Sequence, residues 1–194
     1  VCRLAVAALS LLAVMAPATA ANVRDPASPT ILLTGSNRGV GLALATEFAA
    51  QGWNVIATTR TPQKATELKA LAAANPKVII EQLDVTDHAG VDALATRYKD
   101  QPIDVLLSNA AKTPRYMSAM KGAATIDYEE ARNSFEINAL GPAKLVADFL
   151  PHVQKSNQKK IAVISSKAGS FAEGPQMAMM YEYRTSKAAL NMII

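Results

Sequence analysis

Cysteine and histidine are both scarce in this chain of 194 residues, which contains one cysteine, Cys2, and two histidines, His88 and His152. A single cysteine excludes an intrachain disulfide. The histidines are far apart in the sequence, and neither has cysteine or carboxylate neighbours at the spacing that a metal site requires. The sequence therefore predicts neither a disulfide-stabilised domain nor a metal centre.

Long runs of like charge are also missing. The 20 lysines and arginines exceed the 16 acidic residues, but they are scattered along the chain and form no basic stripe. Nucleic-acid-binding surfaces gather their cations on one face or segment, so no nucleic-acid partner is expected. The net charge of +4 suits a small anionic ligand instead.

No apolar run is long enough to cross a membrane as a helix. The run over residues 4–16 falls short of the roughly 20 residues that a span needs. It follows Arg3 and precedes a small-residue sequence ending at Ala20, which is typical of a secretory signal peptide cleaved after Ala20. We therefore expect a leader over residues 1–20. Use of this leader implies an exported or periplasmic protein without a membrane span in the mature chain. A leader that is not used, or an extension without a targeting role, implies a cytoplasmic one.

Residues 21–29 are polar with two prolines and predict a linker. From residue 30 onward, short apolar runs alternate with segments of helical pattern. The predicted strands cover residues 30–35, 53–60, 77–85, 103–111 and 159–169. The predicted helices cover residues 40–52, 61–75, 87–101 and 128–154, and a last helix begins between Met177 and Tyr183. This alternation predicts one α/β domain over residues 30–194, a doubly wound parallel sheet of the Rossmann type that binds ligands at the carboxyl ends of its strands.

A glycine-rich turn follows the first predicted strand and opens the first predicted helix. Its glycines are Gly35, Gly39 and Gly41. Glycine permits a tight turn and a close approach of backbone to a pyrophosphate at the helix N-terminus, so this context predicts a dinucleotide site. A purely structural turn is the alternative.

The end of the second predicted strand lacks an acidic residue. A carboxylate there commonly binds the ribose 2′-hydroxyl of NAD, whereas this strand ends in two threonines and Arg60. Arg60, together with Arg38 inside the glycine turn, can pair with a 2′-phosphate. The sequence thus favours NADP(H) over NAD, with a merely solvated arginine as the alternative at each position.

Tyr183 and Lys187 are four residues apart in the last predicted helix, which places both on one face. An ammonium close to a tyrosine stabilises its phenolate and brings proton transfer nearer to the working pH. Such a pair also occurs by chance in many helices, so it indicates catalysis only in combination with other motifs.

Several motifs occur together in a fixed order: "TGSNRGVG" (34–41), "LDV" (83–85), "SNAA" (108–111), "INALGP" (137–142), "ISSKAG" (164–169) and "YEYRTSK" (181–187). In this order they resemble the motifs of the short-chain dehydrogenases/reductases. Their amino-acid sequences are most similar to those of sniffer-type carbonyl reductases and C-factor-like proteins. The resemblance covers residues 30–194. It implies that the family's fold continues beyond the active-site helix, so that the domain is expected to be truncated at its C-terminus.

The resemblance also implies roles for individual residues. The catalytic residues would be Asn138, Ser166, Tyr183 and Lys187, with Ser165 as the alternative serine. The cofactor-binding residues would be Gly35, Asn37, Arg38, Gly39, Val40, Gly41, Arg60, Asp84, Val85, Asn109, Ala110, Tyr183 and Lys187. Two positions depart from the family's usual "NNAG": Ser108 replaces an asparagine and Ala111 replaces a glycine.

The implied function is that of an NADP(H)-dependent oxidoreductase. It would transfer a hydride between nicotinamide and a small carbonyl or alcohol substrate, with tyrosine as general acid and base. The resemblance also implies a homo-oligomer. A non-catalytic NADP-binding or signalling protein and an inactive truncated fragment are the alternatives.

Overall fold

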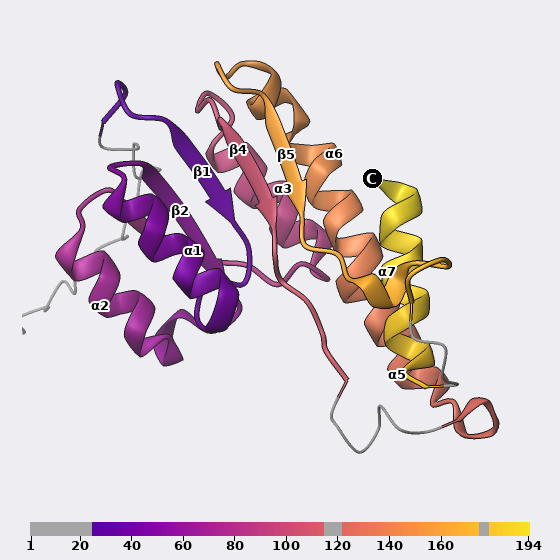
Figure 1. The fold of residues 1–194 in the computed structure, drawn as a ribbon. Coiled ribbons are helices and arrows are strands. Elements are labelled where there is room, and N and C mark those ends of the chain that lie inside the picture. Colours follow the sequence, from indigo (N-terminus) through magenta and orange to yellow (C-terminus); the bar gives the residue numbers. More distant parts are fainter. Residues whose placement is uncertain (1–24, 115–121, 175–178) are drawn as a thin grey trace, which may run out of the picture.

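The computed structural model of the protein describes residues 25–114, 122–174 and 179–194. Its centre is one parallel sheet in the strand order β3-β2-β1-β4-β5, drawn in Figure 1. The strands are β1 (Thr30–Leu33), β2 (Asn54–Thr59), β3 (Val78–Gln82), β4 (Val105–Ser108) and β5 (Lys160–Val163). Each is shorter than its predicted run, because the last residues of the run lie beyond the sheet at its carboxyl edge and, in all strands but β1, the first one or two residues precede the sheet. The predicted leader lies outside the described residues.

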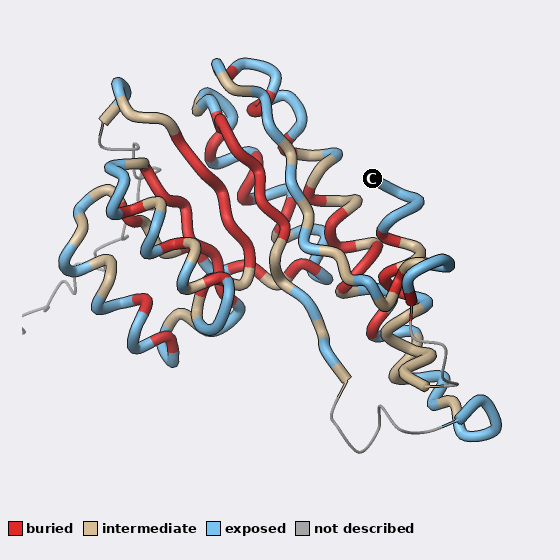
Figure 2. Tube along the Cα trace, viewed as in Figure 1, coloured by how far each residue is buried: buried red, intermediate tan, exposed pale blue. Residues whose placement is uncertain are grey.

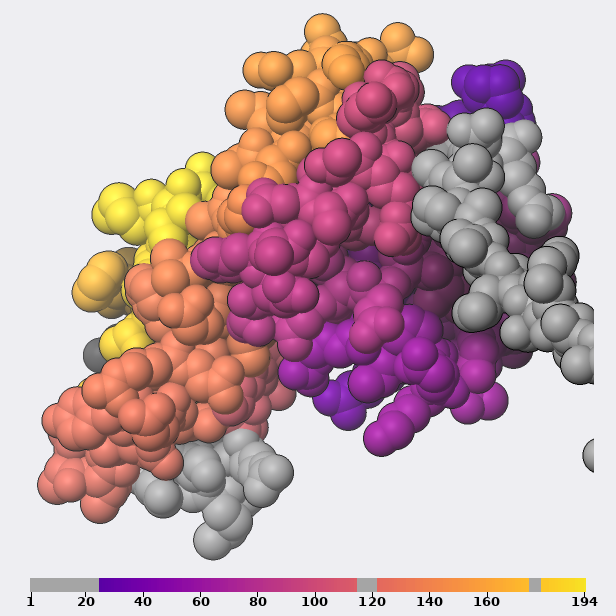
Figure 3. Space-filling view, turned by 180° about the vertical axis from the view of Figure 1, so that it is seen from behind, coloured from indigo at the N-terminus to yellow at the C-terminus, as the bar shows by residue number. Residues whose placement is uncertain are grey.

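Helices cover both faces of the sheet, which confirms the predicted doubly wound fold. The helices are α1 (Gly39–Ala50), α2 (Thr66–Ala74), α3 (His88–Arg97), α5 (Tyr128–Phe135), α6 (Gly141–Gln154) and α7 (Tyr181–Ile193), with the short turns η1 (Pro62–Lys64), η2 (Ala123–Thr125) and η4 (Lys167–Gly169). Helices α1 and α2 pack on one face, and α3 and α6 lie side by side on the other, as Figure 3 shows from behind. Within the described residues, no helix combines the length and apolar character that crossing a bilayer requires.

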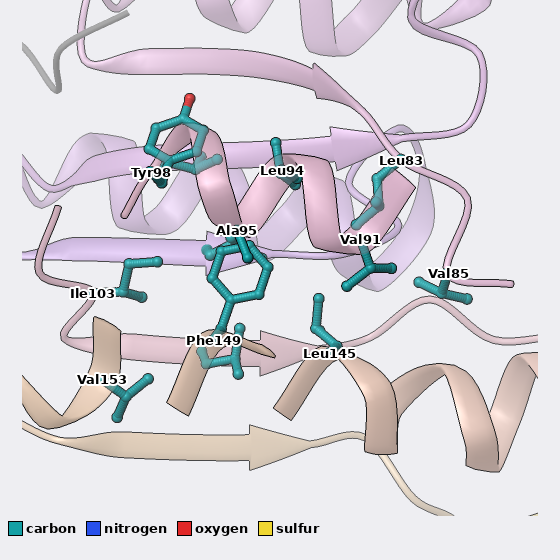
Figure 4. Close-up of a cluster of buried hydrophobic side chains, with 13 residues drawn as sticks. Leu83, Val85, Val91, Leu94, Ala95, Tyr98, Ile103, Leu145, Phe149 and Val153 are labelled. Atoms are coloured by element: carbon teal, nitrogen blue, oxygen red, sulfur yellow. The ribbon is translucent and has the colours of Figure 1, made fainter. Parts of the chain in front are cut away.

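The strands in the middle of the sheet owe their continuous apolar sequence to burial on both faces. Every residue of β1, β2 and β4 is buried, whereas β5 at the edge alternates between exposed and half-buried (Figure 2). Figure 4 shows the core between the sheet and helices α3 and α6, in which Phe149, Leu145 and Leu106 are fully buried. Each such side chain stabilises the fold by roughly 1.5–3 kcal/mol through burial.

A buried polar pair closes the β3 side of this core. The hydroxyl of Tyr98 donates to Oε1 of Glu81 at 2.7 Å, and Arg97 donates to the other carboxylate oxygen at 2.5 Å. Burial, reinforced by the neighbouring Glu81 carboxylate, raises the pKa of Tyr98 above its ordinary value. Tyr98 therefore stays a neutral donor, as this contact requires.

The helix predicted over residues 128–154 is not continuous. A π-helical turn, η3 (Glu136–Leu140), separates α5 from α6. Pro142 has no backbone N–H, so it cannot donate to the carbonyl of Asn138 four residues earlier, and the wider turn accommodates this missing bond. The periodicity predicted the helical segments correctly but not the turn that divides them.

Residues 25–29, within the predicted linker, are held against the start of β2. Asn54 donates to the backbone oxygens of Asp25 and Ser28, at 2.7 and 2.9 Å. Lys77 pairs with the Asp25 carboxylate at 2.6 Å, and this hydrogen bond is the main reason that the pKa of Asp25 falls to about 2. The described chain thus begins with polar contacts to the amino-terminal edge of the sheet, opposite the edge where the candidate site lies.

Candidate active site

One cleft of about 1020 Å³ lies at the carboxyl ends of the strands. The turns that follow all five strands line it, together with α7. Among the lining residues are all thirteen predicted cofactor-binding residues: Gly35, Asn37, Arg38, Gly39, Val40, Gly41, Arg60, Asp84, Val85, Asn109, Ala110, Tyr183 and Lys187. Motifs that are far apart in the sequence therefore meet at the edge where a doubly wound sheet binds ligands.

The glycine turn is packed so closely that larger residues do not fit. Gly35 has a φ of +70°, and a Cβ there would lie 2.9 Å from the Cα of Ala110. A Cβ on Gly41 would lie 2.1 Å from the carbonyl oxygen of Gly35. Gly39 has a φ of +56°, but a Cβ on it would meet no atom of the described residues within 4 Å. Gly35 and Gly41 are thus required by contact, and Gly39 by backbone conformation alone.

The N-terminus of α1 faces this turn without a side-chain cap in the described residues, and its first turn holds no acid. The first backbone N–H groups of a helix have no partner within the helix, and the helix dipole places partial positive charge there. A phosphate is the natural partner of such a helix end.

Thr34 and Asn109 join the glycine turn to the loop after β4. The Thr34 hydroxyl accepts the backbone N–H groups of Asn109 and Ala110, both at 3.0 Å. The Asn109 side chain donates to the carbonyls of Thr34 and Gly35, at 3.0 and 3.2 Å. Sequence reasoning identified Asn109 but missed Thr34, although a hydroxyl directly before a strand-end glycine is a recognisable signal.

Cations dominate the cleft. Arg38, Arg60, Lys112 and Lys187 line it, and Asp84 is the one carboxylate among the lining residues of the described chain. Both arginines are exposed: Arg60 directly follows β2, where sequence analysis expects a 2′-phosphate, and Arg38 lines the same cleft from the glycine turn. Lys112, which sequence reasoning missed, pairs with Glu130 of α5 at 2.7 Å.

Tyr183 and Lys187 project from α7 into the cleft. The Lys187 ammonium lies 5.9 Å from the centre of the Tyr183 ring and donates to the backbone oxygen of Ile164 at 2.8 Å. Lys187 is almost fully buried, and this burial lowers its pKa. The predicted pair therefore shares one face of the helix and one cleft.

Asn138 lies behind the cleft and does not line it. Its fully buried amide accepts the backbone N–H of Lys112 at 2.7 Å and donates to the oxygen of Lys112 at 2.9 Å and to the hydroxyl of Ser186 at 3.0 Å. The structure thus places Asn138 as a brace between the loop after β4 and α7.

The two candidate serines differ in what they offer. Ser165 lines the cleft, but its hydroxyl donates to Asn191 at 2.5 Å. Ser166 does not line the cleft; its oxygen accepts the N–H of Ala168, and its own proton has no acceptor in the described part of the chain. Ser166 therefore keeps a donor available and Ser165 does not.

The two departures from "NNAG" have different consequences. Ser108 is buried, and its hydroxyl has no hydrogen-bond partner among the described residues, so this side chain supplies no bracing bond at the end of β4. Ala111 is exposed and lines the cleft without a positive φ. The loop after β4 accommodates both residues.

The described site has the features of one protein family, and comparison with known sequences agrees. The family model described as "short chain dehydrogenase" matches residues 29–194. The chain belongs to the short-chain dehydrogenase family of oxidoreductases. It is 31% identical over 163 residues to an uncharacterized oxidoreductase of Schizosaccharomyces pombe, covering 82% of this chain and 62% of that protein. It is 34% identical over 102 residues to the C-signal of Myxococcus xanthus, covering 53% and 58%.

Solved structures show the same likeness. A putative short-chain dehydrogenase/reductase from Burkholderia multivorans with bound NADP is 34% identical with a TM-score of 0.74, covering 85% of this chain and 70% of that one. The carbonyl reductase Sniffer of D. melanogaster is 29% identical with a TM-score of 0.74, covering 85% and 72%. These likenesses confirm the predicted family and its nearest branches. The chain spans between 49% and 67% of the length of the curated relatives.

The glycine turn yields a test of stability that needs no ligand. Gly39→Ala should cost about 1–2 kcal/mol, because only the positive φ is strained. Gly41→Ala should cost about 3 kcal/mol or more, because its Cβ meets backbone that cannot move independently. Urea unfolding of the nucleotide-free variants measures both losses, and equal losses would contradict the described packing.

Proposed function

We propose that this chain carries the active site of an NADP(H)-dependent oxidoreductase that interconverts a carbonyl and an alcohol group of a small substrate. One observation carries the proposal: Tyr183 and Lys187 line the same cleft as the glycine turn and the two arginines. A tyrosine–lysine pair is a means of moving a proton, and a glycine turn at a helix N-terminus is a means of holding a dinucleotide. Their presence in one cleft favours proton transfer beside a bound nucleotide.

The residues present fit the nucleotide. A Cβ at Gly35 or Gly41 would collide with neighbouring backbone, so these glycines allow the tight turn. A Cβ at Gly39 would meet no described atom within 4 Å, so this open side of the turn can take a pyrophosphate at the start of α1. Arg38 and Arg60 would hold the 2′-phosphate, and the absence of a carboxylate at the end of β2 disfavours NAD. When bound, the nicotinamide supplies or accepts the hydride.

The chain's own residues would handle the proton and hold the substrate. During carbonyl reduction the Tyr183 hydroxyl gives its proton to the carbonyl oxygen. The Lys187 ammonium, 5.9 Å from the ring centre, stabilises the phenolate that remains. A serine after β5 would hold the same substrate oxygen. Ser166 retains a hydroxyl proton to donate but does not line the cleft, and the alternative, Ser165, lines it but donates its proton to Asn191. Lys187 is buried, so water screens its charge only weakly.

A non-catalytic NADP-binding or signalling protein is the second candidate. The likeness to the C-signal of Myxococcus xanthus favours it. The same cleft would then bind the nucleotide, but carbonyl reduction would be absent. An inactive fragment would neither bind the nucleotide nor reduce a carbonyl.

Tyr183→Phe separates these functions. If the proposal holds, NADPH affinity measured by fluorescence changes little, while the rate of reduction of a panel of aldehydes and ketones falls about 10²- to 10⁴-fold, because the general acid is lost. Tyr181→Phe, two residues earlier on α7 and outside the cleft, is the control and should keep the rate. NADPH binding without reduction by the wild-type chain would favour the second candidate.

Arg38→Ala and Arg60→Ala test the choice of nucleotide. Each loses a charge-assisted hydrogen bond to the 2′-phosphate, so the Kd for NADPH should rise roughly 10- to 100-fold. The Kd for NADH, which lacks this phosphate, should stay the same. Lys64→Ala removes an exposed cation of η1 that does not line the cleft and is the matched control. An equal rise in the Kd values for NADH and NADPH would contradict the assignment of these arginines to the 2′-phosphate.

The two serines are tested against each other. Ser166→Ala should lower kcat about 100-fold, because it removes the donor to the substrate oxygen. Ser165→Ala should have a smaller effect, because its proton is already donated to Asn191. Steady-state kinetics with one reducible carbonyl compound compares the two losses of kcat. A larger loss in Ser165→Ala than in Ser166→Ala would show that Ser165 is the donor to the substrate oxygen.

A further inference from the structure

Ser186 occupies an unusual position in α7. It precedes Lys187 directly, follows Tyr183 by three residues and is fully buried, yet it does not line the cleft. Its hydroxyl donates to the backbone oxygen of Tyr183 at 2.7 Å and accepts the side-chain N–H of Asn138 at 3.0 Å. One buried hydroxyl therefore contacts both the turn of helix that carries the tyrosine and the asparagine behind the cleft.

Asn138 is itself fixed from the other side. Its amide binds both the N–H and the carbonyl of Lys112, so it uses three of the four hydrogen bonds that an asparagine amide can make. Two of these bonds hold the loop after β4, and the third reaches Ser186. A continuous series of buried and partly buried bonds thus runs from the loop after β4, through the π-helical turn, to the backbone of Tyr183.

Besides the partly buried bond from Lys187 to the carbonyl of Ile164, other polar contacts join α7 to the rest of the chain nearer to its ends. Glu182 accepts the backbone N–H of Asp127, and Asn191 accepts the hydroxyl of Ser165; both bonds are exposed. The contact between Ser186 and Asn138 is buried and lies at the middle of the helix, where Tyr183 and Lys187 project. It is therefore placed to fix the rotation of α7 about its own axis.

The geometry of a helix makes this rotation consequential. Successive residues are about 100° apart, so Ser186 lies about 60° from Tyr183 on one side, and Lys187 about 40° on the other. A tyrosine hydroxyl lies roughly 9 Å from the helix axis, so a rotation of about 7° moves it by about 1 Å. Misplacement of a reacting group by this distance can lower a rate by about 100-fold.

We propose that Ser186 is a positioning residue: through Asn138 its hydroxyl fixes the rotation of α7 and thereby the direction in which Tyr183 and Lys187 enter the cleft. The proposal rests on the proposed function, because it assigns to Ser186 the alignment of that catalytic pair. Ser186 does not line the cleft in which the substrate and the nucleotide would lie.

Ser186→Ala in the full chain tests the proposal. The expected result is a kcat lowered 10- to 100-fold, with the Kd for NADPH within twofold of the wild-type value. Thr185→Ala is the matched control, because Thr185 also donates its hydroxyl to a carbonyl of the same helix but is exposed and does not touch Asn138. It should keep the wild-type kcat. Ser186→Cys, which preserves volume but makes only weak hydrogen bonds, should behave like Ser186→Ala.

Two further measurements separate positioning from general destabilisation. Combining Ser186→Ala with Asn138→Ala should lower kcat no further than Asn138→Ala alone, because both act through one bond. Val153→Ala destabilises the core far from α7 and should leave kcat unchanged below its melting temperature. Additive losses in the double variant, or an equal loss of kcat in Val153→Ala, would overturn the proposal.

Amide hydrogen exchange of the nucleotide-free protein gives a readout independent of activity. The amides of α7 between Tyr183 and Leu190 should exchange faster in Ser186→Ala than in the wild type, and at the wild-type rate in Thr185→Ala. If the wild-type chain reduces no carbonyl, the proposed function fails, and exchange still decides whether Ser186 fixes α7. Unchanged exchange in Ser186→Ala would overturn the positioning role.

Discussion

The hydrogen bonds between Thr34 and the backbone of Asn109 and Ala110 fix the frame on which the cleft depends. They join the carboxyl ends of β1 and β4, which are neighbouring strands, at the point where each strand leaves the sheet. The Asn109 side chain in turn donates hydrogen bonds to the carbonyls of Thr34 and Gly35. The glycine turn therefore cannot move without the loop after β4.

That loop then connects the two halves of the site. Three residues beyond Asn109, the backbone of Lys112 is held on both its N–H and its carbonyl by Asn138. Asn138 in turn contacts Ser186 on the helix that carries Tyr183 and Lys187. The bond between Asn138 and Ser186 is buried, where a low dielectric constant strengthens a hydrogen bond, and the two bonds to Lys112 are partly buried. The nucleotide half and the proton-transfer half of the cleft are thus aligned through one short loop.

Much of this arrangement could be predicted from the sequence, because strand and helix periodicities are local properties. Glycine spacing and the Tyr183–Lys187 interval are local too, and these residues meet because parallel strands present their carboxyl ends at one edge. The π-helical turn could not be read from periodicity, since a single wide turn barely disturbs an amphipathic pattern. Ser186 was missed because a hydroxyl inside a helix has many structural uses, and Thr34 was missed although it directly precedes the glycine turn. Their partners, Asn109 and Asn138, are distant in sequence, and only the tertiary structure shows the contacts.

The burial of Lys187 makes the position of its ammonium depend on the helix that carries it. Removing an ammonium from water is unfavourable, and its pKa is lowered accordingly. An ammonium has three hydrogens to donate, and the carbonyl of Ile164 accepts one of them. Among the described residues this backbone bond is the one hydrogen bond of the ammonium, so its other hydrogens can be donated to a polar oxygen that enters the cleft. The direction in which this ammonium enters the cleft depends on how the helix that carries it is held. The buried contact of Ser186 with Asn138 lies one residue away and joins this helix to the π-helical turn.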